Sequence, residues 1–213
     1  MRVRKAVIPA AGFGTRFLPA TRSVPKVMLP VLDRPAIHYA VQEAVESGLE
    51  QVVIVVSPGQ DAVGDYFGRI PALERALERI GDEATLGRML EISEMANVTC
   101  VYQEQRLGLG HAVLTAKSSV GEEPFAVILP DDLIWSDRPT IGSMIETFSK
   151  YRASVIAVKQ VTPEVAAGLG VVDPRPVDDT LSRVVAMVEK PRPEEAPSIA
   201  RANAPESVTD CLS

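Results

Sequence analysis

The chain has 213 residues, of which 46% are hydrophobic and 23% are charged, with 22 Lys and Arg against 28 Asp and Glu. These proportions are typical of a folded domain and exclude a disordered chain. The net charge of −6 argues against a nucleic-acid binder, and no apolar run reaches the ~18 residues of a membrane span. Two cysteines cannot form a disulfide framework, so we expect reduced thiols in a cytoplasmic protein without a membrane partner.

Charge is distributed unevenly along the chain. Residues 1–34 carry seven basic side chains and one acid, Asp33, so this segment has a charge of +6 and the remainder −12. Two interpretations stay open. The segment could hold an anion such as a phosphate, because an anion responds to nearby charge more than to the molecular total. It could also be a basic edge whose side chains pair with acids elsewhere.

Apolar runs and helical stretches alternate along the chain. Apolar runs predict strands at residues 5–9, 51–56, 98–102, 125–129, 154–158 and 183–188. Helical spacing predicts helices at 35–47, from 61 to 95 with breaks near 68–71 and 81, from 111 onward, and at 139–152. This order predicts an α/β fold, a Rossmann-like three-layer sandwich with a mostly parallel, mixed sheet. Ligands of such sheets lie beyond the carboxyl ends of the strands.

A glycine-bearing loop follows the first predicted strand. Gly12 and Gly14 allow the backbone to turn several N–H groups toward one anion. The dinucleotide fingerprint fails at Phe17, which makes a dehydrogenase the weakest option, and the phosphate-loop pattern fails as well. Arg16 and Lys26 can both reach the loop, and these cations favour a phosphate site over a simple tight turn.

Several segments together resemble the sugar-phosphate nucleotidylyltransferases, and among them the bacterial UTP–glucose-1-phosphate uridylyltransferase family. The segments are the Gly-Phe-Gly-Thr-Arg-Phe-Leu-Pro run from residue 12, the Pro-Lys and Met-Leu-Pro-Val runs, and residues 103–113, 124–133 and 188–197. The resemblance covers residues 3–198 in order. It implies a nucleotide-diphospho-sugar transferase fold that transfers a uridylyl group from UTP to glucose 1-phosphate, giving UDP-glucose and pyrophosphate.

The resemblance implies a role for residues of each motif. The backbone at Ala11 and Gly12 would cradle the nucleotide. Gln103 would read the uracil edge with one donor and one acceptor, and Gly108 would let the backbone approach the base. His111 receives no role and is expected to pack at the start of a helix. The residues assigned to nucleotide binding are Ala11, Gly12, Gly14, Thr15, Gln103 and Gly108.

The resemblance also implies the catalytic and sugar-binding groups. Arg16 and Lys26 would hold the nucleotide phosphates, and Asp131, at a strand's carboxyl end, would bind Mg²⁺. Glu189 would hydrogen-bond the sugar beside Gly170, and Lys190 would pair with the sugar phosphate. The assigned catalytic residues are Arg16, Lys26, Asp131 and Lys190; the sugar-phosphate residues are Gly170, Glu189 and Lys190.

The chain departs from the family pattern at two places. Val27 stands where the family usually has an acid, which removes a polar contact beside Lys26. Beyond residue 198 the family's further strands, helices and second metal-binding aspartate are not recognisable. We therefore expect an incomplete nucleotidyltransferase domain at residues 1–198, an irregular tail at 199–213 and reduced activity.

Other expectations accompany these assignments. The resemblance implies a homo-oligomer that binds UTP and glucose 1-phosphate and no nucleic acid. Two alternative functions stay open, a thymidylyltransferase acting on a sugar 1-phosphate and a catalytically dead module that binds a nucleotide or nucleotide sugar.

Overall fold

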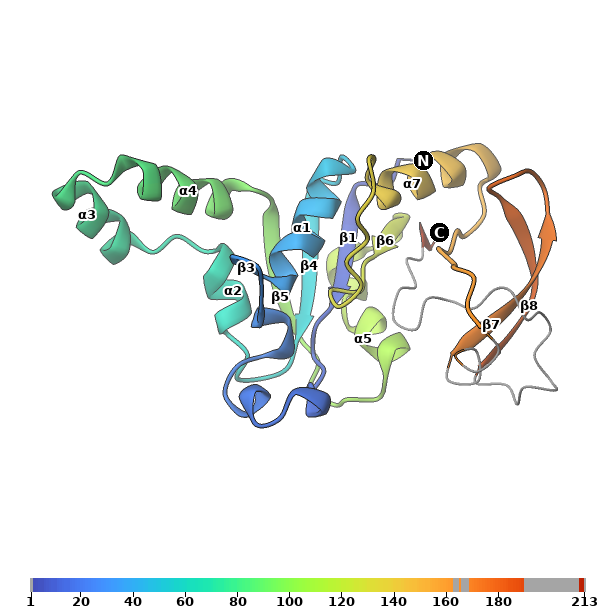
Figure 1. Ribbon diagram of the computed structural model, residues 1–213, viewed down its shortest axis with the longest axis horizontal. Helices are drawn as coiled ribbons and strands as arrows, with labels where there is room; N and C mark the ends of the chain where they lie inside the picture. Colours follow the sequence, from blue (N-terminus) through green and yellow to red (C-terminus); the bar gives the residue numbers. More distant parts are fainter. Residues whose placement is uncertain (1, 163–164, 166–168, 190–210, 213) are drawn as a thin grey trace.

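A parallel β-sheet forms the centre of the protein. The computed structural model describes residues 2–162, 165, 169–189 and 211–212 (Figure 1). The sheet has the strand order β5-β4-β1-β6-β9, and the first four strands are parallel, which confirms the predicted α/β fold. The strands are β1 (Lys5–Pro9), β4 (Gln51–Val56), β5 (Asn97–Tyr102), β6 (Phe125–Val127) and β9 (Cys211–Leu212).

The strands are apolar on both sides because helices cover both faces of the sheet. Ile54 and its alternate neighbours in β4 belong to one buried cluster, whereas Val53 and Val55 belong to a second cluster on the opposite face. The first face packs against α1 (Ala36–Glu46), α2 (Ala62–Phe67) and α7 (Thr140–Tyr151). The second packs against α5 (Leu109–Thr115) and α6 (Lys117–Val120). This is the predicted three-layer sandwich.

Two further helices project from the body as a helical arm (Figure 1). They are α3 (Pro71–Ile80) and α4 (Glu83–Glu94), and the breaks before and between them fall where the sequence predicted them. Gly81 ends α3 with a φ of 71°, a left-handed conformation that suits glycine. Asp82 begins α4, and its carboxylate accepts a hydrogen bond from the Thr85 N–H. None of the described helices is long and apolar enough to span a bilayer.

Two strand predictions were wrong in whole or in part. Residues 154–158 form no strand, and the sheet edge beside β6 is paired antiparallel with β9. β8 (Ser182–Glu189) is a strand, but it pairs with β7 (Gly170–Pro176) in a separate antiparallel hairpin outside the main sheet. The pair β6–β9 also shows that residues 211–212 of the expected irregular tail are extended and paired.

Short elements connect β1 to α1. They are the 3₁₀ turns η1 (Thr15–Phe17), η2 (Ala20–Arg22) and η3 (Lys26–Met28), then the two-residue strands β2 (Pro30–Val31) and β3 (Arg34–Pro35). Val27 is 2% exposed and belongs to the main core cluster. A valine at this position therefore anchors η3 by packing, where an acid would place a charge in the core.

Candidate functional site

Polar residues gather where the parallel strands end. β1 leads into the loop 10–14, β4 into Ser57, β5 into Gln103, and β6 through Leu129 and Pro130 into Asp131. Because these strands are adjacent and parallel, their carboxyl ends lie along one edge of the sheet. The site residues assigned after β1, β5 and β6 therefore converge, whereas Glu189, at the end of β8, belongs to the separate hairpin.

The loop after β1 is shaped by Gly14. This residue has a φ of 62° and its carbonyl accepts a hydrogen bond of 2.8 Å from the Thr21 hydroxyl. A Cβ added to Gly14 would lie 2.8 Å from Cβ of Lys26, so the glycine lets the base of the lysine side chain approach closely. At Gly12 the same construction meets nothing within 4 Å, so the loop is open to a ligand on that side.

Lys26 and Asp131 form an ion pair at the centre of this edge. The Lys26 Nζ lies 2.6 Å from Oδ2 of Asp131, and both side chains are about a third exposed or less. Asp131 belongs to the loop after β6, whose turn is closed by a hydrogen bond from the Asp132 N–H to the Leu129 carbonyl. A cation and a carboxylate predicted separately from the sequence thus meet at one point.

Arg106 and Ser57 join the glycine loop to the neighbouring loops, and sequence reasoning did not identify either. The Arg106 Nε donates to the Ala11 carbonyl at 2.9 Å and lies 3.0 Å from the Ser57 hydroxyl oxygen, which itself donates to the same carbonyl at 2.9 Å. The guanidinium also lies 3.5 Å from the centre of the Phe13 ring. Ser57 could have been found as the first polar residue after a predicted strand, a position that Gln103 also occupies.

Gln103 is 4% exposed and is held by the start of α5. Its Nε2 donates to Nδ1 of His111 at 2.9 Å and to the Gly108 carbonyl at 3.4 Å. Gly108 has a φ of 94°, a conformation that glycine adopts without strain. The sequence suggested that the amide would offer a donor and an acceptor to a base, whereas here the donor is directed to protein atoms. His111 is thus more than a packing residue.

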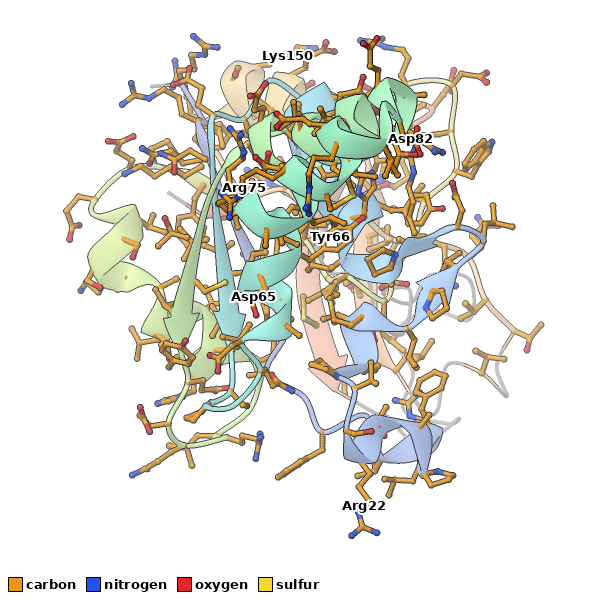
Figure 2. All side chains as sticks on the ribbon, turned by 90° about the vertical axis from the view of Figure 1, so that its left-hand side faces the viewer. Arg22, Asp65, Tyr66, Arg75, Asp82 and Lys150 are labelled. Atoms are coloured by element: carbon orange, nitrogen blue, oxygen red, sulfur yellow. The ribbon has the colours of Figure 1, made fainter. Side chains whose placement is uncertain are left out.

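Some basic side chains of the N-terminal segment pair with acids, and others lie near the loop after β1. Arg4 and Lys5 both lie within 3.6 Å of Glu123, and Arg2 lies 3.5 Å from Glu50, as expected of a basic edge. Arg22, in contrast, projects from the end of the molecule opposite Asp82 and Lys150 (Figure 2). Arg16, next to Thr15 in η1, is exposed on the same loop as Lys26. The phosphate-binding interpretation thus concerns the loop after β1 and not the whole segment.

The sugar-binding residues assigned from the sequence are only partly placed. Gly170 at the start of β7 pairs with Glu189 at the end of β8, so the hairpin brings these two positions together from 19 residues apart in the numbering. Lys190 lies outside the described residues. Their roles therefore stay predictions.

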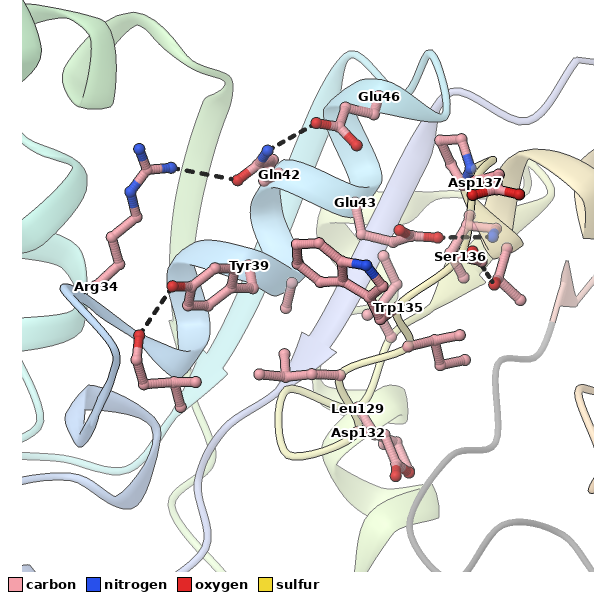
Figure 3. A pocket seen from close by; sticks show the side chains of 18 of the residues that line it. Arg34, Tyr39, Gln42, Glu43, Glu46, Leu129, Asp132, Trp135, Ser136 and Asp137 are labelled. Atoms are coloured by element: carbon pink, nitrogen blue, oxygen red, sulfur yellow. Dashed lines mark hydrogen bonds between the residues drawn. The ribbon is translucent and has the colours of Figure 1, made fainter.

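A cavity lies beside this edge, on the α1 side (Figure 3). Its volume is about 610 Å³, and it lies between α1 and the loop that follows β6. None of the assigned site residues that the structure describes lines it. Trp135 lines this cavity and is 97% exposed.

His38 is the second histidine and lies buried on α1. Its Nε2 is 3.0 Å from an Arg34 guanidinium nitrogen, and its Nδ1 is 3.0 Å from the Tyr66 hydroxyl. Burial lowers the pKa of His38 below its ordinary value, Arg34 lowers it further, and Asp33 acts in the opposite direction. His38 is thus a neutral connection between β3, α1 and α2, outside the candidate site.

A magnesium ion fits the donor set at Asp131. Among the residues that the structure describes, no three His, Cys, Asp or Glu side chains gather into a metal site. Mg²⁺ does not require such a cluster, because it is commonly held by one or two carboxylates together with substrate phosphates. Asp131, with its carboxylate accessible beside Lys26, meets that requirement.

The sequence matches one protein-family model, described as nucleotidyl transferase, over residues 5–204. Two uridylyltransferases of Bacillus subtilis (strain 168) are similar. UTP–glucose-1-phosphate uridylyltransferase YngB is 45% identical over 92% of this chain and 66% of its own length, and UTP–glucose-1-phosphate uridylyltransferase is 42% identical over 92% and 68%. The chain thus spans about two thirds of the length of these relatives.

Solved structures show the same likeness. A UTP-bound UGPase from Acinetobacter baumannii has a TM-score of 0.90 and 40% identity, covering 99% of this chain and 74% of that one. A UDP-glucose pyrophosphorylase complexed with UDP-glucose has a TM-score of 0.84 and 38% identity, covering 99% and 76%.

Proposed function

This chain belongs to the nucleotidyl transferase family, and we propose that it transfers a uridylyl group from UTP to glucose 1-phosphate, giving UDP-glucose and pyrophosphate. The Lys26–Asp131 ion pair beside an open glycine loop is the observation that carries the proposal. Uridylyltransferase relatives at 42–45% identity support the choice of substrates.

The reaction needs positioning and charge neutralisation more than proton transfer. A phosphate oxygen of glucose 1-phosphate attacks the α-phosphorus of UTP, and the bond to the β-phosphate oxygen breaks as pyrophosphate leaves. The second pKa of a phosphate monoester is about 6, so the attacking oxygen is already an anion near neutral pH. No general base is required, and none is assigned.

Cations of the loop after β1 neutralise the transferred and leaving phosphates. Lys26 is held by η3, which Val27 anchors in the core, and Gly14 permits its close approach to the loop. Arg16 lies on the same loop and is the second cation. A Cβ at Gly12 would meet no described atom within 4 Å, which leaves room for a nucleotide phosphate to approach the loop there. Asp131 would hold Mg²⁺, which supplies charge neutralisation on the phosphates when bound.

On the sugar side, the β7–β8 hairpin supplies Gly170 and Glu189. Glu189 binds a glucose hydroxyl, and Gly170 permits the sugar to lie against the backbone. Lys190 follows directly and pairs with the sugar phosphate. These three roles rest on the family resemblance, with the Gly170–Glu189 pairing as support.

The resemblance further suggests a cytoplasmic enzyme that assembles from identical chains. Leu32 is 91% exposed and Trp135 is 97% exposed at the cavity beside α1, and apolar side chains exposed to this degree favour a contact surface. Light scattering of the purified chain across a concentration series measures its molar mass. A monomer at all concentrations would contradict the assembly.

Product formation from defined substrates tests the proposed reaction. The purified chain is incubated with Mg²⁺, glucose 1-phosphate and either UTP or dTTP, and nucleotide sugar and pyrophosphate are quantified separately. We expect UDP-glucose and pyrophosphate in equal amounts, with UTP preferred over dTTP. Preference for dTTP would favour the thymidylyltransferase. Tight UTP binding measured by calorimetry without product would favour the binding module.

A further inference from the structure

The amide of Gln103 is held in one orientation by two acceptors at the start of α5. Its Nε2 lies 2.9 Å from Nδ1 of His111 and 3.4 Å from the Gly108 carbonyl oxygen. The same carbonyl also accepts the Ala112 N–H at 3.1 Å. The Gly108 carbonyl oxygen decides which amide atom faces it, and the shorter bond to His111 holds the amide in that orientation. Gln103 is almost fully buried, and its backbone N–H is bound to the Val56 carbonyl at 2.8 Å.

The identity of each atom follows from hydrogen-bond chemistry. A carbonyl oxygen only accepts, so the amide atom near Gly108 is the nitrogen and not the oxygen. An amide nitrogen only donates, so His111 accepts at Nδ1 and carries its proton on Nε2. Reversing the amide would place Oε1 against the Gly108 carbonyl oxygen, so that two acceptors faced each other. With both hydrogens of Nε2 used, Oε1 is the polar atom that remains, and none of the described residues donates to it.

We propose that His111 is a positioning residue that turns the Gln103 carbonyl oxygen toward the base and thereby selects uracil over cytosine. Uracil carries a hydrogen on N3, which Oε1 can accept, whereas cytosine presents a lone pair at N3. An acceptor facing a lone pair repels it and leaves both groups unpaired, which costs more than the loss of one hydrogen bond. The inference rests on the proposed function, because it needs a pyrimidine nucleotide beside Gln103.

Substitution at His111 tests the selection directly. In His111→Leu the acceptor at Nδ1 is lost and the amide can turn, whereas in His111→Asn a side-chain oxygen can accept in its place. We expect the wild-type chain to prefer UTP over CTP by at least ~100-fold in kcat/KM. We expect this preference to fall by about tenfold in His111→Leu and to persist in His111→Asn.

His38→Leu is the matched control for loss of a buried histidine. It removes contacts to Arg34 and Tyr66, away from Gln103, so it should lower stability and leave the ratio of UTP to CTP activity unchanged. An unchanged ratio in His111→Leu, or an equally reduced ratio in His38→Leu, would overturn the inference. Equilibrium binding of UTP and CTP, measured on the same variants, separates recognition of the base from the later chemistry.

Nitrogen NMR of the imidazoles provides a test that needs no variant to fold. The chain has two histidines, and their hydrogen bonds require opposite neutral forms. His38 accepts from Arg34 at Nε2 and so carries its proton on Nδ1, whereas His111 carries its proton on Nε2. We expect one histidine protonated on Nδ1 and the other on Nε2. If both neutral histidines carried the proton on Nδ1, His111 could not accept from Gln103, and the inference would be overturned.

Failure of the proposed function would look different. A wild-type chain that forms UDP-glucose while His111→Leu keeps full discrimination would contradict only the role of His111. A wild-type chain that neither binds UTP nor forms UDP-glucose would contradict the proposed function, and with it the selection of uracil.

Discussion

Lys26 Nζ lies 2.6 Å from Asp131 Oδ2, although 105 residues separate the two in the sequence. The contact joins η3, in the connection after β1, to the loop after β6, and these strands are neighbours in the sheet. Each charge lowers the desolvation free energy of holding the other, partly buried, at the sheet edge. A polyphosphate with its cation could exchange partners with this pair, phosphate pairing with the lysine and metal with the carboxylate.

Replacing Lys26 by Met should lower kcat for UDP-glucose formation by about 10²- to 10³-fold, the usual effect of removing one charge-stabilising group. Because the ion pair is partly exposed, unfolding free energy should change by less than about 1 kcal/mol. Steady-state kinetics and urea denaturation measure the two effects. Arg4→Met, which breaks an exposed pair with Glu123, is the control and should retain full activity. Comparable losses in both variants would contradict a specific role for Lys26.

Gly14→Ala and Gly12→Ala should fail in different ways. At Gly14 the left-handed backbone costs an alanine about 1–2 kcal/mol, and the new Cβ would push against Lys26. We therefore expect lower stability together with a fall in kcat. At Gly12 a methyl group meets no protein atom, so stability should persist while KM for UTP rises. Denaturation curves and KM values separate the cases, and equal stability loss in both variants would refute the difference.

Arg106→Ala should loosen the glycine loop. It removes hydrogen bonds to the Ala11 carbonyl and the Ser57 hydroxyl and the contact with the Phe13 ring. We expect KM for UTP to rise about tenfold and amide exchange at residues 10–14 to accelerate. Arg106→Lys should recover only part of this, because lysine lacks the planar fork of donors. Unchanged amide exchange at residues 10–14 in Arg106→Ala would show that the arginine does not order the loop. Arg79→Ala, on the helical arm, is the control for loss of one positive charge.

Stability should depend on pH through His38. Its pKa in the folded state is lowered, chiefly by burial and then by Arg34 against the opposing effect of Asp33, so the unfolded chain binds the proton more readily. The stabilisation is therefore complete above the unfolded pKa of about 6.5 and is lost as pH falls below it. Unfolding free energy should rise with pH between about 5 and 7.

His38→Gln, which keeps an acceptor for Arg34 but cannot titrate, should flatten this rise. Carboxyl groups with lowered pKa values act separately, because their stabilisation is lost only below about pH 4.5. These groups are Glu74, Asp82, Glu123 and Asp178. Urea denaturation at several pH values measures the profile, and a slope that persists in His38→Gln would assign the effect to other groups.

Much of the fold could be predicted from local patterns. The β4 run from Gln51 to Val56 is apolar at successive positions, which a strand buried on both faces requires, and its bounds agree with the prediction. Gly81 and Gly48 stop helices where left-handed backbone is needed. In contrast, residues 154–158 resemble a buried strand but form none, and β6 pairs with β9 instead. The apolar pattern of a segment does not show which strand it pairs with.

The sequence by itself determined the parallel α/β architecture, the glycine loop and the chemical types of the site residues, because burial period and turn chemistry are properties of neighbouring residues. Only the tertiary structure decided that Lys26 meets Asp131, that Arg106 binds the Ala11 carbonyl 95 residues away, and that His111 holds Gln103. The strand order β5-β4-β1-β6 brings the first two pairs together, and no local pattern encodes that order. The Gln103–His111 contact is close in sequence, but it depends on how Gly108 turns the chain into α5.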